Sequence, residues 1–248
     1  MERLEKLIAY LAPDLDLPQN REEQEWVLRA LMNLWEPKVM PAEFWSLQDA
    51  YLQEKFTQKK VTGLSDLQEV EPQIYLWQGD ITSLEVDAIV NAANSQLLGC
   101  FVPHHRCIDN AIHSQAGLQL RLACYQLMKA QGNLEATGQA KITPAYNLPA
   151  NYVIHTVGPI IQEEVCPQDE ALLASSYQKS LELAVEKGLT SIAFCCISTG
   201  EFRFPNQLAA EIAVRTVRNF IKEHPEINVI FNVFKDKDKE NYQKLLKR

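Results

Sequence analysis

Apolar residues at the start of the chain recur at helical spacing. The first stripe should belong to a helix that ends near Pro13, and it consists of Leu4, Leu7, Ile8 and Leu11. Asn20, followed three residues later by Glu23, is typical of a helix N-cap, and Pro37 marks the end of this second helix. The stripe expected to face the core comprises Trp26, Val27, Ala30, Leu31 and Leu34.

A third helix is expected at residues 41–60. The apolar face of this segment comprises Phe44, Leu47, Tyr51 and Leu52. Three helices with no intervening strand signal predict that residues 1–70 form a helical extension, separate from the rest of the chain.

From residue 71 the pattern changes to short apolar runs that alternate with helical ones. Strands are expected at 74–77, 88–91, 152–156, 192–197 and 229–233. Helices are expected at 108–114, 117–130, 170–187, 206–224 and 237–246. The strand runs are apolar without alternation, as expected when both faces of a sheet are covered. Residues 71–248 are therefore predicted to form an α/β fold, a three-layer α/β/α sandwich with a mixed, largely parallel sheet.

Composition narrows the classes of function. The chain has 248 residues, of which 46% are hydrophobic and 23% charged, and a formal net charge of −8. This acidity argues against nucleic acid as a partner, because such binding depends on clustered Lys and Arg. No apolar run reaches the roughly 18 residues that cross a membrane, and the charged start of the chain lacks a secretory h-region. We therefore expect a cytoplasmic protein whose six cysteines are mainly thiols.

Metal-ligating residues cluster between an expected strand and an expected helix. Cys100, His105 and Cys107 lie within eight positions, and thiolate with imidazole favours Zn²⁺ over hard cations. Three protein ligands with an open fourth position are typical of catalytic zinc, whereas structural sites usually have four. Two alternatives stay open: His104 could replace its neighbour, and His113 could be a fourth ligand or a core histidine. The other cysteines are interpreted as core or bystander residues.

A second loop, CISTGEFRFP at 196–205, follows another buried strand. Consecutive backbone N–H groups from Ser198 onward could form an anion-binding nest without any lysine, next to a helix that begins after Pro205. An ordinary strand-to-helix turn is the alternative. Arg203 is a candidate phosphate partner, and the two phenylalanines of this loop could stack on a ligand or pack in the core. Ligands of open α/β sheets bind outside the carboxyl ends of strands, where both loops should emerge.

Four further polar residues could serve the same site. Asp80, after the first strand, could accept a hydrogen bond from an exocyclic amine of adenine or could cap the turn that follows it. Asn91 and Asn94 could orient sugar hydroxyls or occupy turn positions. Asp109 could be a general base, an outer partner of a zinc ligand, or a helix N-cap.

Taken together, these residues resemble those of a macrodomain, the fold that binds ADP-ribose. The matching segments are QGDIT at 78–82, DAIVNAANSQLLG at 87–99, CIDNAIH at 107–113, TGQAKITPAYNLPANYVIHTVGP at 137–159 and ISTGEFRFP at 197–205. Ordinary hydrolytic macrodomains carry a glycine run where this chain has GCFVPHHRC. In this respect the chain is similar to the bacterial zinc-dependent subclass, whose members also carry an N-terminal helical extension.

The resemblance implies a role for each matching position. It implies Cys100, His105 and Cys107 as zinc ligands, with His105 preferred to His104. It places adenine at Asp80 and Ile81 and the distal ribose at Asn94. It places the phosphates at Ser198, Thr199, Gly200, Glu201 and Phe202. It also implies two partner proteins, a sirtuin-like ADP-ribosyltransferase and a lipoylated carrier protein.

We therefore predict a zinc-dependent hydrolase that removes mono-ADP-ribose from acidic side chains of modified proteins. Asn94 and Asp109 are its candidate catalytic residues, and zinc would act as a Lewis acid or activate a bound water. The alternative is a noncatalytic ADP-ribose reader in which zinc only stiffens the loop. The target protein, the oligomeric state and the role of the extension are not specified by the sequence.

Overall fold

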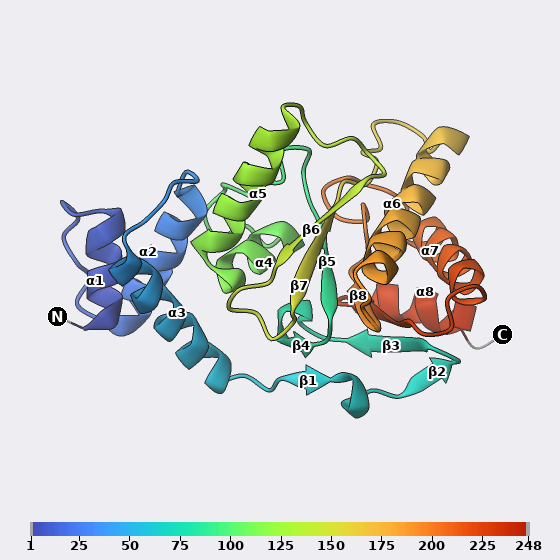
Figure 1. Cartoon of the computed structure of the whole chain (residues 1–248), viewed down its shortest axis with the longest axis horizontal. Coiled ribbons are helices and arrows are strands. Elements are labelled where there is room, and N and C mark those ends of the chain that lie inside the picture. The colour runs from blue at the N-terminus through green and yellow to red at the C-terminus, as the bar shows by residue number, and fades with distance from the viewer. Residues whose placement is uncertain (1, 247–248) are drawn as a thin grey trace.

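Residues 2–246 are described by the computed structural model, which arranges helices in layers around one main sheet (Figure 1). Its seven strands lie in the order β2, β3, β9, β8, β5, β7, β6. Their bounds are Glu69–Glu71 (β2), Ile74–Gln78 (β3), Ala88–Ala92 (β5), Ala140–Pro144 (β6), Tyr152–Thr156 (β7), Ser191–Phe194 (β8) and Asn228–Val233 (β9). The five inner strands run parallel and the edge strands β2 and β6 are antiparallel to their neighbours, which confirms the mixed, mostly parallel sheet.

Helices cover both faces of this sheet. One face carries α4 (Ile108–Ala116) and α5 (Leu118–Gln131), and the other carries α6 (Pro167–Glu186), α7 (Asn206–Ile221) and α8 (Asp236–Leu246) (Figure 1). A minor parallel pair joins β1 (Thr62–Gly63) to β4 (Leu84–Glu85), and short 3-10 turns occupy Leu64–Asp66 and Ile81–Ser83. No helix within residues 2–246 is long and apolar enough to cross a membrane.

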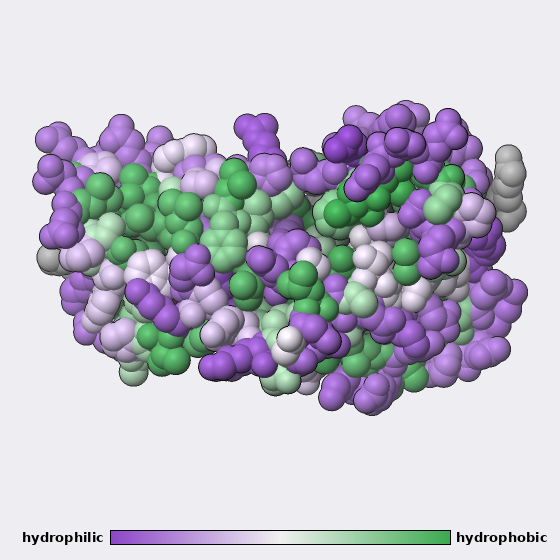
Figure 2. Space-filling view, turned by 90° about the horizontal axis from the view of Figure 1, so that it is seen from above, coloured by the Kyte–Doolittle hydropathy of each residue, from purple (hydrophilic) through white to green (hydrophobic). Residues whose placement is uncertain are grey.

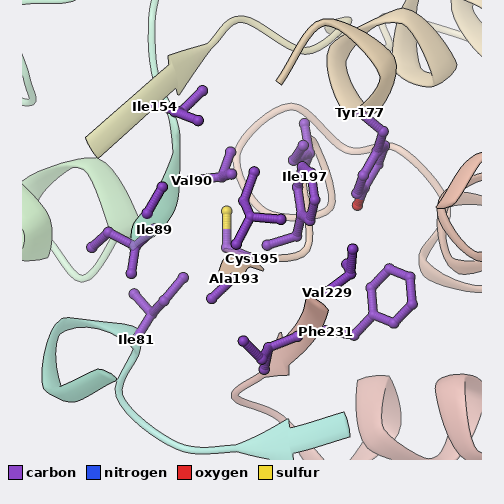
Figure 3. Close-up of a cluster of buried hydrophobic side chains, with 14 of the residues drawn as sticks. Ile81, Ile89, Val90, Ile154, Tyr177, Ala193, Cys195, Ile197, Val229 and Phe231 are labelled. Atoms are coloured by element: carbon purple, nitrogen blue, oxygen red, sulfur yellow. The ribbon is translucent and has the colours of Figure 1, made fainter. Parts of the chain in front are cut away.

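The core lies between the sheet and its helices. Branched residues of β5, β7 and β9 meet side chains of α6 and of the loop after β8 (Figure 3). In the central strands β5 and β8 almost every side chain is buried, as the unalternating apolar runs predicted. The strand predicted at 192–197 ends at Phe194, because only Ser191 to Phe194 pair with β9. The edge strands β2 and β6 were not predicted, since they are partly exposed and carry few apolar residues.

Three helices form the N-terminal extension at one end of the molecule (Figure 1): α1 (Arg3–Leu11), α2 (Arg21–Leu34) and α3 (Ala42–Thr57). Asn20 caps α2 as expected, because its side chain accepts a hydrogen bond from the Glu23 N–H at 2.8 Å. These helices bury a hydrophobic cluster of their own, to which the α/β unit contributes Leu118. The division into an extension at 1–70 and an α/β domain at 71–248 stays a proposal, and β2 of the main sheet spans this boundary.

The predicted inner face of α2 is confirmed only in part, because Val27 and Leu31 pack against the hydrophobic cluster but the centre of the buried face differs. Its buried residues are Gln24, Leu28, Met32 and Asn33, whereas Trp26 is 64% exposed and Leu34 is 54% exposed. The helix is rotated relative to the prediction because polar Gln24 and Asn33 make buried hydrogen bonds to the rest of the chain. Apolar side chains consequently remain at the surface of the extension, where Figure 2 shows a large green region.

Candidate functional site

The predicted site residues gather at one edge of the sheet. Strands β3, β9, β8, β5 and β7 are parallel, so their carboxyl ends meet at this edge. The loops that follow β3, β5 and β8 begin near Gly79, Ala93 and Cys195. Each of them carries a group of residues that the sequence marked, and this is the edge at which open α/β sheets bind ligands.

The metal loop, residues 99–107, brings the three predicted ligands together. The ligand atoms of Cys100, His105 and Cys107 all lie within 4.8 Å of one another, and Cys100 Sγ is 3.6 Å from His105 Nδ1. All three residues are half-buried. Two sulfurs and an imidazole nitrogen at this spacing are a donor set that suits zinc. His113 is not part of this group, so the loop brings together three candidate ligands and not four.

The adjacent imidazole of His104 points elsewhere. His104 has a left-handed backbone, with φ of 56°, and its ring stacks on Trp26 of α2 with centroids 3.4 Å apart. Burial and the nearby Arg29 charge lower the pKa of His104. Of the two histidines, His105 is the one grouped with the two sulfurs, and it stays the candidate ligand.

Cys107 also begins helix α4. Its sulfur accepts a hydrogen bond from the Asn110 N–H at 3.3 Å, which is the geometry of an N-cap. Burial raises the pKa of the Cys107 thiol to about 12; the Asn110 N–H opposes this shift and the Cys100 charge adds to it. A bound divalent cation would reverse this balance, because it deprotonates coordinating thiols. The N-cap interpretation of Asp109 is wrong, since Cys107 occupies that position.

Asp109 instead faces the interior from the first turn of α4, where it is 6% exposed. Its Oδ1 accepts a hydrogen bond from Asn91 Nδ2 at 2.8 Å, and its Oδ2 accepts one from Asn94 Nδ2 at 3.3 Å. Burial raises the pKa of Asp109 to about 6, although hydrogen bonds from Asn91 and Asn94 and the charge of Arg121 lower it. The carboxylate is therefore a buried anchor for two asparagines.

Asn94 connects this anchor to the metal loop. Its Nδ2 also donates to the Gly99 carbonyl at 3.1 Å, and its Oδ1 accepts the Gln96 N–H at 3.0 Å. Asn91, by contrast, is completely buried in β5 and faces Asp109 and His155. Of the two asparagines, only Asn94 is partly exposed.

Behind Asp109 lies a polar cluster whose arrangement the sequence did not reveal. The cluster is formed by His113, Cys124, Thr143 and His155. His155 Nδ1 lies 3.2 Å from Asn91 Nδ2, its Nε2 lies 3.0 Å from Thr143 Oγ1, and burial lowers its pKa to about 3. The signal that could have found it is a histidine inside the apolar strand YVIHT. The cluster fixes Asn91, and through it Asp109, from the core side.

The phosphate loop, residues 198–202, has the features of an anion nest. Ser198 has a left-handed φ of 64°, and its carbonyl accepts the Phe204 N–H at 2.9 Å. The N–H groups of Gly200, Glu201 and Phe202 have no hydrogen-bond partner among residues 2–246. Consecutive free N–H groups of this kind attract anions.

Close packing fixes the start of this loop. A Cβ on Gly158 would lie 2.0 Å from Ser198 Oγ, so only glycine fits beneath the phosphate loop at this position. Ser198 is buried and its Oγ has no hydrogen-bond partner within the described chain. Phe204 is 1% exposed and packs in the core, Phe202 is half-buried, and Arg203 is exposed.

Asp80 and Ile81, which the resemblance places at adenine, differ in their exposure and contacts. Asp80 Oδ1 accepts hydrogen bonds from the N–H and Oγ1 of Thr82, so the capping interpretation is confirmed. Its Oδ2 lies 3.4 Å from Lys59 Nζ, just after helix α3 of the extension. The Asp80 side chain is 47% exposed, whereas Ile81 is buried in the core (Figure 3). Ile81, which is 1% exposed, therefore presents almost no surface to a ligand in this structure.

Known proteins match most of the chain. The Macro domain family model matches residues 90–213. A protein named Protein-ADP-ribose hydrolase from Treponema medium is 51% identical over 99% of this chain and 98% of its own length. One of the same name from Staphylococcus aureus strain MRSA252 is 47% identical over 94% of this chain and 89% of its own.

Solved structures of macrodomains are also similar to this chain in fold and in sequence. The Oceanobacillus iheyensis macrodomain with ADP has a TM-score of 0.66 and 37% identity, covering 73% of this chain and 94% of that one. The Trypanosoma brucei macrodomain in complex with ADP-ribose has a TM-score of 0.69 and 31% identity, covering 88% of this chain and 94% of that one.

Proposed function

The chain belongs to the macrodomain family, and we propose that it is a zinc-dependent hydrolase that releases mono-ADP-ribose from aspartate or glutamate side chains of proteins. The observation that carries this proposal is the grouping of Cys100, His105 and Cys107 within 4.8 Å, at the sheet edge that also presents the phosphate loop. The names of the two relatives, which specify a hydrolase of protein-bound ADP-ribose, support the reaction class.

The phosphate loop would bind the pyrophosphate. The free N–H groups of residues 200–202 supply local positive potential in a chain whose net charge is −8. Asp80 Oδ2 retains acceptor capacity for the exocyclic amine of adenine beside Lys59. With both ends of the nucleotide held, the distal ribose is delivered to the metal loop in one orientation. Such positioning can supply roughly 7 to 11 kcal/mol of the barrier at best.

Cys100, His105 and Cys107 would hold the zinc, which when bound supplies a Lewis acid or a bound water with a pKa of about 7. Asn94 is placed to orient the ribose and to keep the metal loop in position, because its amide already bonds the Gly99 carbonyl. Asp109 holds that amide from the interior. As a buried anchor it is better placed to position Asn94 than to accept a proton from a solvent-side water.

The bond to be broken is an ester between a protein carboxylate and the anomeric carbon of the distal ribose. Its hydrolysis consumes one water and returns the free carboxylate and ADP-ribose. Two partner proteins remain part of the proposal, a sirtuin-like ADP-ribosyltransferase that adds the modification and a lipoylated carrier protein. A cytoplasmic location is likewise proposed.

The test compares binding with turnover. Cys100→Ala and His105→Ala should abolish release of ADP-ribose from an aspartate- or glutamate-modified protein, while ADP-ribose binding measured by calorimetry persists. Cys166→Ala, at an exposed cysteine outside the metal loop, is the matched control and should retain both. Full release by the two ligand variants would reject the zinc mechanism. Binding without release in the wild type would favour a noncatalytic reader, and release from arginine-modified protein alone would reject the acidic linkage.

A further inference from the structure

The N-terminal extension contacts the metal loop directly, through a stacked pair of rings. Trp26 of α2 and His104 lie parallel to within 8°, with ring centroids 3.4 Å apart. His104 immediately precedes His105 and has the left-handed φ that turns the chain at this point. Non-glycine residues adopt this conformation only when their surroundings hold them in it. The indole ring is part of those surroundings.

A second contact from the same helix fixes the backbone of the loop. Asn33, which is 1% exposed, accepts the His104 N–H through Oδ1 at 3.0 Å. Its Nδ2 donates to Ser114 Oγ of α4 at 2.9 Å. One side chain of α2 thus ties the metal loop to the helix that Cys107 begins. A buried amide that is satisfied on both sides holds its partners in one geometry.

A third contact reaches the two cysteines through Asn110. Arg29 Nη2 donates to Asn110 Oδ1 at 3.1 Å, and Asn110 Nδ2 donates to the Val102 carbonyl at 3.0 Å and contacts the Cys100 carbonyl at 3.5 Å. The Asn110 N–H is the group that donates to Cys107 Sγ. Asn110 is completely buried, so its orientation depends on these partners.

We propose that α2 positions the metal loop for cation binding, and that Trp26, Asn33 and Arg29 are the positioning residues. They hold the metal loop so that His105 points toward Cys100 and Cys107 before any cation arrives. The extension thereby raises metal affinity by preorganising the ligands. This inference rests on the zinc site proposed above and gives the extension a function that packing alone does not require.

Trp26 is the informative position, because it is 64% exposed. Truncation of an exposed side chain ordinarily has little effect on stability. A loss of metal affinity at this position would therefore report on the stack and not on the fold. Leu34, on the same helix and 54% exposed, provides the matched control for loss of an exposed apolar side chain.

The experiment uses the full chain and measures metal binding without turnover. Wild type, W26A, W26F, H104A, the double variant W26A/H104A and L34A are titrated with Co²⁺, whose visible bands report tetrahedral thiolate coordination, and with Zn²⁺ against a chelator. Thermal unfolding of each metal-free variant is measured in parallel. W26A and H104A should raise the dissociation constant by about 10-fold, the lower range for outer partners of metal ligands.

Three further results are expected. W26F should retain most of the affinity, L34A should match the wild type, and the double variant should lose no more than either single variant, because the two rings act as one pair. Equal affinity of W26A, H104A and the wild type would overturn the inference while leaving the zinc proposal intact. An equal loss in L34A would also overturn it. A wild type that binds neither cation would reject the proposed function, and this inference with it.

Discussion

The imidazole of His105, in the metal loop, faces Glu201 of the phosphate loop, with Nε2 3.7 Å from Glu201 Oε1. Its other nitrogen, Nδ1, faces Cys100 Sγ at 3.6 Å. Metal-bound histidines usually donate their outer N–H to a carboxylate or carbonyl, which fixes the tautomer and the ring orientation. Glu201 is placed to do this from the opposite loop, so the two loops meet through one side chain.

Glu201→Gln should therefore weaken zinc binding and slow release of ADP-ribose. The loss of affinity should stay at or below about 10-fold, because the Glu201 side chain is 74% exposed and its charge is well screened. Zinc competition titration checks this expectation, with the exposed Glu223→Gln as control. A variant with wild-type affinity and turnover would show that the contact has no functional role.

Gly158→Ala should displace the phosphate loop and weaken ADP-ribose binding. The added methyl would lie 2.0 Å from Ser198 Oγ and 2.8 Å from Ile197 Cγ2, so the loop must shift. Overpacking of this kind costs about 1–3 kcal/mol, and we expect ADP-ribose affinity to fall by roughly 10-fold or more. Calorimetric titration with ADP-ribose is the measurement. Gly63→Ala, whose new methyl meets only ordinary contacts at 3.7 Å or more, should bind normally.

Arg121→Lys should loosen the attachment of the extension. The buried guanidinium donates through Nη1 to the carbonyls of Met32, Asn33 and Trp35, and through Nε to that of Leu98. An ammonium cannot reproduce this fork of donors. We expect a loss of about 2–4 kcal/mol in the free energy of unfolding, measured with urea, whereas the exposed Arg215→Lys should have no effect. An unchanged midpoint for Arg121→Lys would show that the carbonyls find other partners.

Asp87 should make stability depend on acid pH. Burial alone would raise its pKa, but hydrogen bonds from Thr190 and Ser191 outweigh burial and hold the pKa below its ordinary value. Because the folded pKa lies below the unfolded value of about 3.9, the stabilisation is present above that pH and is lost as the pH falls through the folded pKa. Asp87→Asn should cost about 1 kcal/mol at pH 7, and this difference should vanish in strong acid. A difference that persists unchanged in acid would contradict this account.

The sequence was sufficient to predict an element or a group of site residues where the signal is local. The strand at 152–156 was predicted with the bounds that the structure has, because an apolar β-rich run between turn residues has few other conformations. The ligands Cys100, His105 and Cys107 could be grouped because they lie within eight positions. The phosphate loop could be located because a buried strand led into it.

The sequence was insufficient to predict contacts between residues that lie far apart along the chain. The choice between the two histidines depends on Trp26, which lies 78 positions before His104, and no local pattern signals that contact. The buried face of α2 was predicted only in part, because buried Asn33 is polar and its partners are in other elements. The sequence could not exclude Asp109 as the N-cap of α4. The N-cap is whichever of the Cys107 sulfur and the Asp109 carboxylate accepts hydrogen bonds from the first N–H groups of the helix.

The measurement that tests the central claim most directly is release of ADP-ribose from an aspartate-modified protein by one preparation in three states: as purified, after removal of metal by a chelator, and after Zn²⁺ is restored. We expect about one zinc per chain in the first state, loss of release in the second and full recovery in the third, with ADP-ribose binding retained throughout. Undiminished release by the metal-free protein, or release that does not return with Zn²⁺ although ADP-ribose still binds, would contradict the claim that the Cys100, His105 and Cys107 group carries the chemistry.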